Sequence, residues 1–96
     1  MLVLITYDVN TTTAEGKQRL RLVAKKCVAH GQRVQNSVFE CLLDEAQYRV
    51  LKADLMQTID REKDSLRFYE LGNKYQSKVE HVGAKSAYSP EDVLMV

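Results

Sequence analysis

The chain has 96 residues, of which 45% are hydrophobic and 28% charged, and its formal net charge is +1. These values are typical of one globular domain and exclude a low-complexity or strongly basic chain. The apolar run at residues 2–5 is too short for a membrane span or a signal peptide, so we expect a cytoplasmic protein without membrane contact. The two cysteines, Cys27 and Cys41, lack a C-x-x-C spacing, and we expect both to be reduced and buried.

The first half of the chain predicts a strand, a helix and two short strands. Residues 2–7 are rich in apolar and β-branched side chains, which indicates a strand that is buried on both faces. Thr12 and Glu15 have the spacing of a capping box, so a helix should begin there and end at His30 and Gly31. Residues 34–42 have strand composition with a polar interruption, which predicts two short strands that meet at a tight turn or a bulge.

The second half predicts a helix and a strand, followed by a shorter strand. Asp44 and Gln47 again have capping-box spacing, and a helix is expected over residues 44–59. Residues 65–71 alternate as in a strand, and residues 78–82 are expected to form a short edge strand.

The resulting βαββαβ order, with the additional short C-terminal strand, predicts an α+β, ferredoxin-like sandwich over residues 1–83 and a tail over 84–96. Two helices can cover only one face of its sheet, so a second copy of the chain is expected on the other face.

Asp8 is the leading candidate for a functional carboxylate because it directly follows the buried first strand. Mg²⁺ binds one or two carboxylates together with water and phosphate oxygens. A two-fold axis that brings two copies of Asp8 together would therefore make a credible site. The alternative is that Asp8 only caps the turn through a hydrogen bond toward Asn10.

A second candidate feature is a basic ridge on the first predicted helix. Lys17, Arg21 and Lys25 are spaced by four residues and therefore share one side of the helix, with Arg19 and Lys26 flanking them. Such a ridge can bind phosphates, but a solvated helix face is the alternative.

Other clusters of metal-binding residue types are weaker. The acidic residues at 60–64 begin like a calcium loop, but Ser65 replaces its glycine and Leu71 its bidentate glutamate. We interpret this segment as a charged connector. The cysteines and histidines lack the spacing of a zinc site.

Two segments resemble the Cas2 family of CRISPR-associated endonucleases, the small partners of the integrase in spacer acquisition. They are Ile-Thr-Tyr-Asp-Val at residues 5–9 and Arg-Val-Gln-Asn-Ser-Val-Phe-Glu-Cys at residues 33–41. The resemblance implies that Asp8 holds Mg²⁺, with Mn²⁺ as an alternative, and that Tyr7 assists it. The resemblance also implies that three arginines contact nucleic acid: Arg19, Arg21 and Arg33. It implies supporting roles for Ser37 and Phe39.

The resemblance implies a metal-dependent endonuclease that hydrolyses double-stranded DNA, with single-stranded RNA as the alternative substrate. It would act as a homodimer in spacer acquisition and antiviral defence, and its last strand, within residues 75–82, would be exchanged between protomers. A rival hypothesis is a non-catalytic dimeric adaptor that bridges integrase subunits and supports duplex DNA. A toxin-like ribonuclease on the same fold is a third possibility, since this fold hosts unrelated functions.

Overall fold

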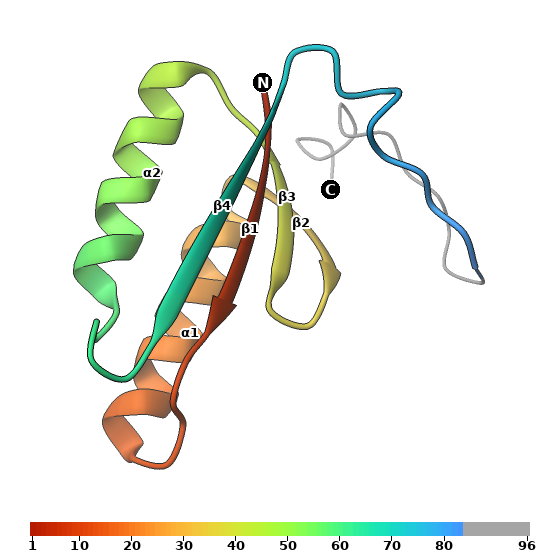
Figure 1. Cartoon of the computed structure of the whole chain (residues 1–96). Coiled ribbons are helices and arrows are strands. Elements are labelled where there is room, and N and C mark those ends of the chain that lie inside the picture. Colours follow the sequence, from red (N-terminus) through yellow and green to blue (C-terminus); the bar gives the residue numbers. More distant parts are fainter. Residues whose placement is uncertain (84–96) are drawn as a thin grey trace.

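The structure, a computed structural model, describes residues 1–83. Its sheet is antiparallel, with the strand order β2-β3-β1-β4, and both helices lie on one side of it (Figure 1). This arrangement confirms the predicted ferredoxin-like sandwich. The elements in chain order are β1 (Leu2–Asp8), α1 (Ala14–Val28), β2 (Gly31–Gln35), β3 (Val38–Leu42), α2 (Glu45–Thr58) and β4 (Ser65–Gly72).

The core lies between the helices and the inner face of the sheet. Successive side chains of a strand point to opposite faces, so Val3, Ile5 and Tyr7 of β1 share the inner face. The helices bury a stripe of apolar side chains against them, as their periodicity predicted. The principal partners from the other elements are Val23, Cys27, Phe39, Cys41, Tyr48, Leu51 and Leu55.

The outer face of the sheet is also rich in apolar side chains. Leu4 is half-buried there and pairs across the sheet with Tyr69, which is 41% exposed. Val38 and Leu42 of β3 are half-buried on the same face. We call this surface, which is formed by Leu4, Val38, Leu42 and Tyr69, the outer apolar face.

The helix starts confirm one of the two predicted capping boxes. Asp44 and Gln47 exchange both bonds: Asp44 Oδ1 accepts from the Gln47 amide at 2.7 Å, and Gln47 Oε1 accepts from the Asp44 amide at 3.0 Å. The predicted cap at Thr12 is wrong by one residue, because Thr13 caps α1 by accepting from the Gly16 amide. Thr12 instead belongs to the turn before α1, where its amide and hydroxyl both donate to Asn10 Oδ1.

Gly31 has a different role from the predicted helix cap. Helix α1 ends at Ala29 in right-handed geometry, and Gly31 already begins β2. A Cβ atom at Gly31 would lie 2.4 Å from Cys41 Sγ and 2.4 Å from the Glu40 carbonyl oxygen. Glycine is therefore needed here for the close approach of β2 to β3.

The predicted edge strand at residues 78–82 is wrong for the described chain. These residues pair with no strand among residues 1–83, and the Lys78 amide instead closes a turn by donating to the Tyr75 carbonyl at 2.8 Å. A strand forms only where a neighbouring strand satisfies its backbone groups. The tail at residues 84–96 lies outside the described residues, within which no helix is long and apolar enough to cross a membrane.

Candidate active site

Asp8 ends β1 with its side chain exposed. Within residues 1–83 its carboxylate makes no hydrogen bond or ion pair. The alternative in which Asp8 caps the following turn is wrong, because Asn10 does so by accepting from the Thr12 amide at 3.0 Å. The Asp8 carboxylate therefore makes no bond within the local structure and is available to bind a cation.

A shallow cavity of about 270 Å³ lies beside Asp8 at the end of the β1–β4 pair. Ser65 is the direct cross-strand neighbour of Asp8, and Arg67 stands opposite Thr6, two residue pairs further along. The Arg67 guanidinium donates to the Tyr69 hydroxyl at 3.2 Å. The cavity thus combines a free carboxylate with a guanidinium, which is a group suited to phosphate.

Arg67 and Tyr69 were not identified from the sequence as site residues. The available signal was the alternation of residues 65–71, which places Ser65, Arg67 and Tyr69 on one face. That pattern does not show which strand lies beside β4. Only the observed register brings this face of β4 next to Asp8.

The donor set at Asp8 fits a hard divalent cation that is completed by other oxygen ligands. No three acidic, histidine or cysteine side chains of the described chain come together as a metal site. Mg²⁺ nevertheless binds through one or two carboxylates when substrate phosphates and water fill the remaining positions. Asp8 can supply one such ligand per chain.

Tyr7 faces away from Asp8, into the core. Its side chain is 6% exposed and stacks on Phe39, with ring centroids 6.0 Å apart and planes 22° apart. Burial raises the pKa of the Tyr7 hydroxyl, and the neighbouring Arg33 guanidinium opposes that rise. The geometry therefore favours a supporting role for Tyr7, with its side chain on the opposite face of β1.

The Ser-Val-Phe run at residues 37–39 contacts the end of β1. Ser37 occupies the β2–β3 turn at a φ of 64°, a conformation that few non-glycine residues adopt, and its carbonyl accepts from the Tyr7 amide at 3.1 Å. The Arg33 guanidinium lies 5.2 Å from the centroid of the Phe39 ring. Ser37, Phe39 and Arg33 together fix the strand that carries Asp8.

Two groups of basic residues behave differently in the structure. Lys17, Arg21 and Lys25 are exposed along α1, and Arg21 and Arg33 line one cavity of about 300 Å³. Arg19, in contrast, forms an ion pair with Asp64 at 2.7 Å, with side chains that are 16% and 0% exposed, respectively. The predicted basic ridge is present without Arg19.

The cysteines offer no nucleophile. Cys27 and Cys41 are both buried and free. Burial raises the pKa of each thiol to about 12, so neither forms a thiolate near neutral pH.

Comparison with known proteins identifies the family. The family model described as CRISPR associated protein Cas2 matches residues 1–79. A CRISPR-associated endonuclease Cas2 of Halalkalibacterium halodurans is 60% identical over 95 residues, 99% of either chain. A CRISPR-associated endoribonuclease Cas2 of Nitratidesulfovibrio vulgaris is 56% identical over 96 residues, covering 100% of this chain and 94% of that protein.

A solved structure supports the same assignment. The crystal structure of Streptococcus pyogenes Cas2 at pH 6.5 superposes with a TM-score of 0.75 at 57% sequence identity, and it covers 86% of this chain and 100% of that one. Sequence and fold agree over most of both molecules. This chain belongs to the Cas2 family of CRISPR-associated proteins.

Proposed function

We propose that this chain is a metal-dependent endonuclease that hydrolyses phosphodiester bonds with Asp8 as its metal ligand. The observation that carries the proposal is the free carboxylate of Asp8, exposed at the end of a rigid interior strand and beside the guanidinium of Arg67. The names of the relatives, endonuclease and endoribonuclease, support the same reaction class.

Each residue of the site has a definable task. Asp8 holds the cation, for which Mg²⁺ is the first candidate and Mn²⁺ the second. When bound, such a cation polarises a phosphoryl oxygen and lowers the pKa of water. Arg67 holds a phosphate oxygen of the substrate near Asp8, while Tyr7 and Phe39 keep the strand beneath in place.

A homodimer supplies the second carboxylate. The outer apolar face lies on the same face of β1 as Asp8, since Leu4, Thr6 and Asp8 alternate with the core residues. Burial of this face against a second copy would remove apolar area from water and bring two Asp8 side chains to one interface. Two carboxylates that share a cation fit the preference of Mg²⁺ better than one.

The basic surface of α1 suits a nucleic-acid backbone. Lys17, Arg21 and Lys25 present exposed cations in a row, and contacts of this kind position phosphates without reading sequence. We propose duplex DNA as the substrate, with single-stranded RNA as the alternative, because phosphate contacts of this kind suit either backbone. The biological setting is spacer acquisition and antiviral defence with the CRISPR integrase as partner.

The adaptor function rests on the same surface. Only one carboxylate per chain lies in the cavity, whereas the cations of α1 are well exposed. A dimer that bridges integrase subunits and supports duplex DNA would need the cations and not Asp8. The two functions therefore predict different effects of changing one residue.

The decisive variant is Asp8→Asn, assayed on duplex DNA and on single-stranded RNA with Mg²⁺, Mn²⁺ or chelator. Because the Asp8 side chain has no partner within residues 1–83, the variant should keep its fold while cleavage falls by about a hundredfold or more. Glu62→Gln is the control, since it removes an exposed carboxylate outside the cavity and should leave cleavage unchanged.

The outcome separates the two functions. Unchanged metal-dependent cleavage by folded Asp8→Asn would exclude the proposed nuclease site. Absence of cleavage by the wild-type chain on both substrates, together with DNA binding that Arg21→Gln weakens, would favour the adaptor.

A further inference from the structure

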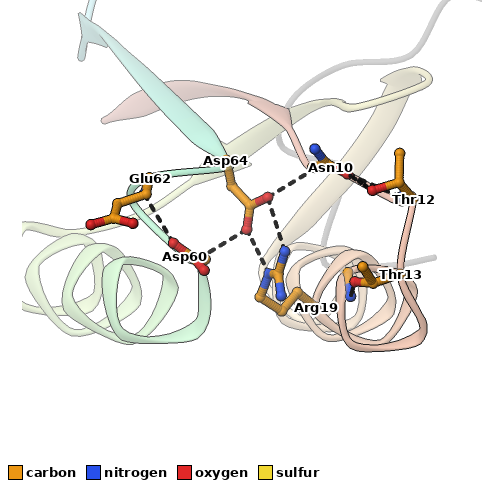
Figure 2. Close-up of polar contacts among 8 residues, drawn as sticks. Asn10, Thr12, Thr13, Arg19, Asp60, Glu62 and Asp64 are labelled. Atoms are coloured by element: carbon orange, nitrogen blue, oxygen red, sulfur yellow. Dashed lines mark hydrogen bonds and ion pairs between the residues drawn. The ribbon is translucent and has the colours of Figure 1, made fainter.

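The side chain of Asp64 is fully buried at the end of the sheet that carries Asp8. Its Oδ1 accepts from the Asn10 amide at 2.9 Å, and its Oδ2 accepts from the Asp60 amide at 2.9 Å. Arg19 donates to Oδ2 through Nε at 2.7 Å and approaches Oδ1 through Nη2 at 3.4 Å. Figure 2 shows these four residues, called here the Asp64 network, meeting between the two helices and the loop after β1.

The network fixes the backbone directly after Asp8. Asn10 is two residues from Asp8, and its own Oδ1 accepts from the amide of Thr12 at 3.0 Å and from its hydroxyl at 2.7 Å. On the other side, a Cβ atom at Gly16 would lie 1.9 Å from the Asn10 carbonyl oxygen, so α1 packs directly on this loop. The loop is thus held by Asp64, by its own turn and by α1.

The charges of the network are balanced. Burial alone raises the pKa of Asp64, but the hydrogen bonds from Arg19, Asp60 and Asn10 outweigh burial and lower this pKa below its ordinary value. Arg19 therefore neutralises the buried Asp64 carboxylate, and its guanidinium is already bonded to that carboxylate. A second ion pair, Lys26 with Asp54 at 2.7 Å, is more exposed and does not touch this loop.

We infer that Asp64 and Arg19 are positioning residues for Asp8, and that Arg19 makes no contact with nucleic acid. The inference rests on the proposed nuclease function, because positioning matters through the chemistry at Asp8. Asp64 acts through the Asn10 amide, and Arg19 acts by keeping Asp64 charged and in place. A metal-dependent reaction slows when the backbone that orients the metal-binding carboxylate becomes mobile.

The first test measures the loop without metal or nucleic acid. Asp64→Asn should raise amide hydrogen exchange in residues 9–12 by about tenfold or more, while exchange in α2 stays unchanged. Asp54→Asn is the matched control, because it breaks the other ion pair and should not affect this loop. Unchanged exchange in residues 9–12 of Asp64→Asn would overturn the inference, whatever the activity of the protein.

The second test separates positioning from catalysis. With saturating Mg²⁺, Asp64→Asn should lower kcat by about tenfold with little change in KM, since substrate contacts remain. A loosened loop with unchanged kcat would refute positioning while leaving the proposed function intact. Cleavage that survives Asp8→Asn would instead refute the proposed function itself.

The third test addresses Arg19 through the salt dependence of binding to duplex DNA in the presence of chelator. Loss of one phosphate contact reduces the slope of log K against log salt by about one. Arg21→Gln should show this reduction, and Arg19→Gln should not. If Arg19→Gln does not fold, the double variant Arg19→Gln/Asp64→Asn removes both charges and should keep the wild-type slope. A reduced slope in either Arg19 variant would overturn the inference.

Discussion

At the scale of single residues, the two acidic side chains at this end of the sheet have opposite environments. Asp8 is exposed and unpartnered within the described chain, whereas Asp64 is buried and accepts several hydrogen bonds. An unpartnered exposed carboxylate contributes little to stability and remains available to a ligand. A buried, fully bonded carboxylate contributes to the fold and is closed to ligands.

The lowered pKa of Asp64 predicts how stability depends on pH. The Asp64 carboxyl loses its proton more readily in the folded state than in the unfolded chain. The stabilisation that its charge provides is therefore complete above the ordinary pKa of 3.8. It is lost as the pH falls through the lower pKa of the folded state. Urea unfolding of the wild type should therefore show stability falling as the pH drops below about 4.

Asp64→Asn provides the comparison for this pH dependence. The variant should be less stable than the wild type at pH 6, and the difference should shrink at pH 3, where protonation of Asp64 weakens the wild type as well. A difference that stays constant between pH 3 and pH 6 would show that the carboxylate charge of Asp64 is not the stabilising feature.

The sequence could not reveal the Asp64 network. Asp64 lies 54 residues from Asn10 and 45 residues from Arg19, so no local spacing links them. Its neighbours Asp60 and Glu62 resemble the start of a calcium loop, but the glycine and the glutamate of such a loop are missing, which indicates only a charged connector. Arg19 is expected among the phosphate-binding cations because it flanks the basic ridge and the family resemblance implies such a contact. Helical spacing shows which side of a helix a residue occupies, but not which residue it contacts there.

At the scale of elements, periodicity and capping predicted all six helices and strands of the described fold. Local signals were sufficient where the determinant was local, as in the capping box of Asp44 and Gln47. They failed where the role of a residue depends on a contact with a distant part of the chain. Gly31 has the position expected of a glycine that ends a helix, but glycine is required there because a side chain would collide with Cys41 of β3.

Gly16 provides an element-scale prediction with an unusual sign. Glycine to alanine inside a helix ordinarily stabilises by about 1 kcal/mol. At Gly16 the added Cβ would lie 1.9 Å from the Asn10 carbonyl oxygen, so α1 or the loop must move. Gly16→Ala should therefore destabilise the protein by about 1–3 kcal/mol in urea unfolding.

The control for Gly16→Ala is Gln18→Ala, an exposed position on the same helix that should change stability by less than about 0.5 kcal/mol. A displacement of the loop after Asp8 would also lower cleavage. Stabilisation by Gly16→Ala would show that the contact between α1 and this loop is not tight.

At the scale of the whole molecule, the outer apolar face predicts self-association. Leu4→Glu places a carboxylate on that face directly opposite Glu40 of β3, and it should convert a dimer to a monomer in sedimentation experiments, because burial of an unpaired charge is unfavourable. Val50→Glu is the matched control, since Val50 is 70% exposed on α2. Equal sedimentation of Leu4→Glu and wild type would exclude this face as the interface.

Association through this face has a consequence for catalysis, because it makes each site depend on two chains. If both copies of Asp8 hold one cation, a heterodimer of wild type and Asp8→Asn has an incomplete site. After subunit exchange of an equimolar mixture, only the wild-type homodimers, about one quarter of all dimers, would be active. If each Asp8 acts alone, activity should instead be about one half. Measuring cleavage across a series of mixing ratios distinguishes a quadratic from a linear dependence on the wild-type fraction, and a linear dependence would contradict a site shared across the two-fold axis.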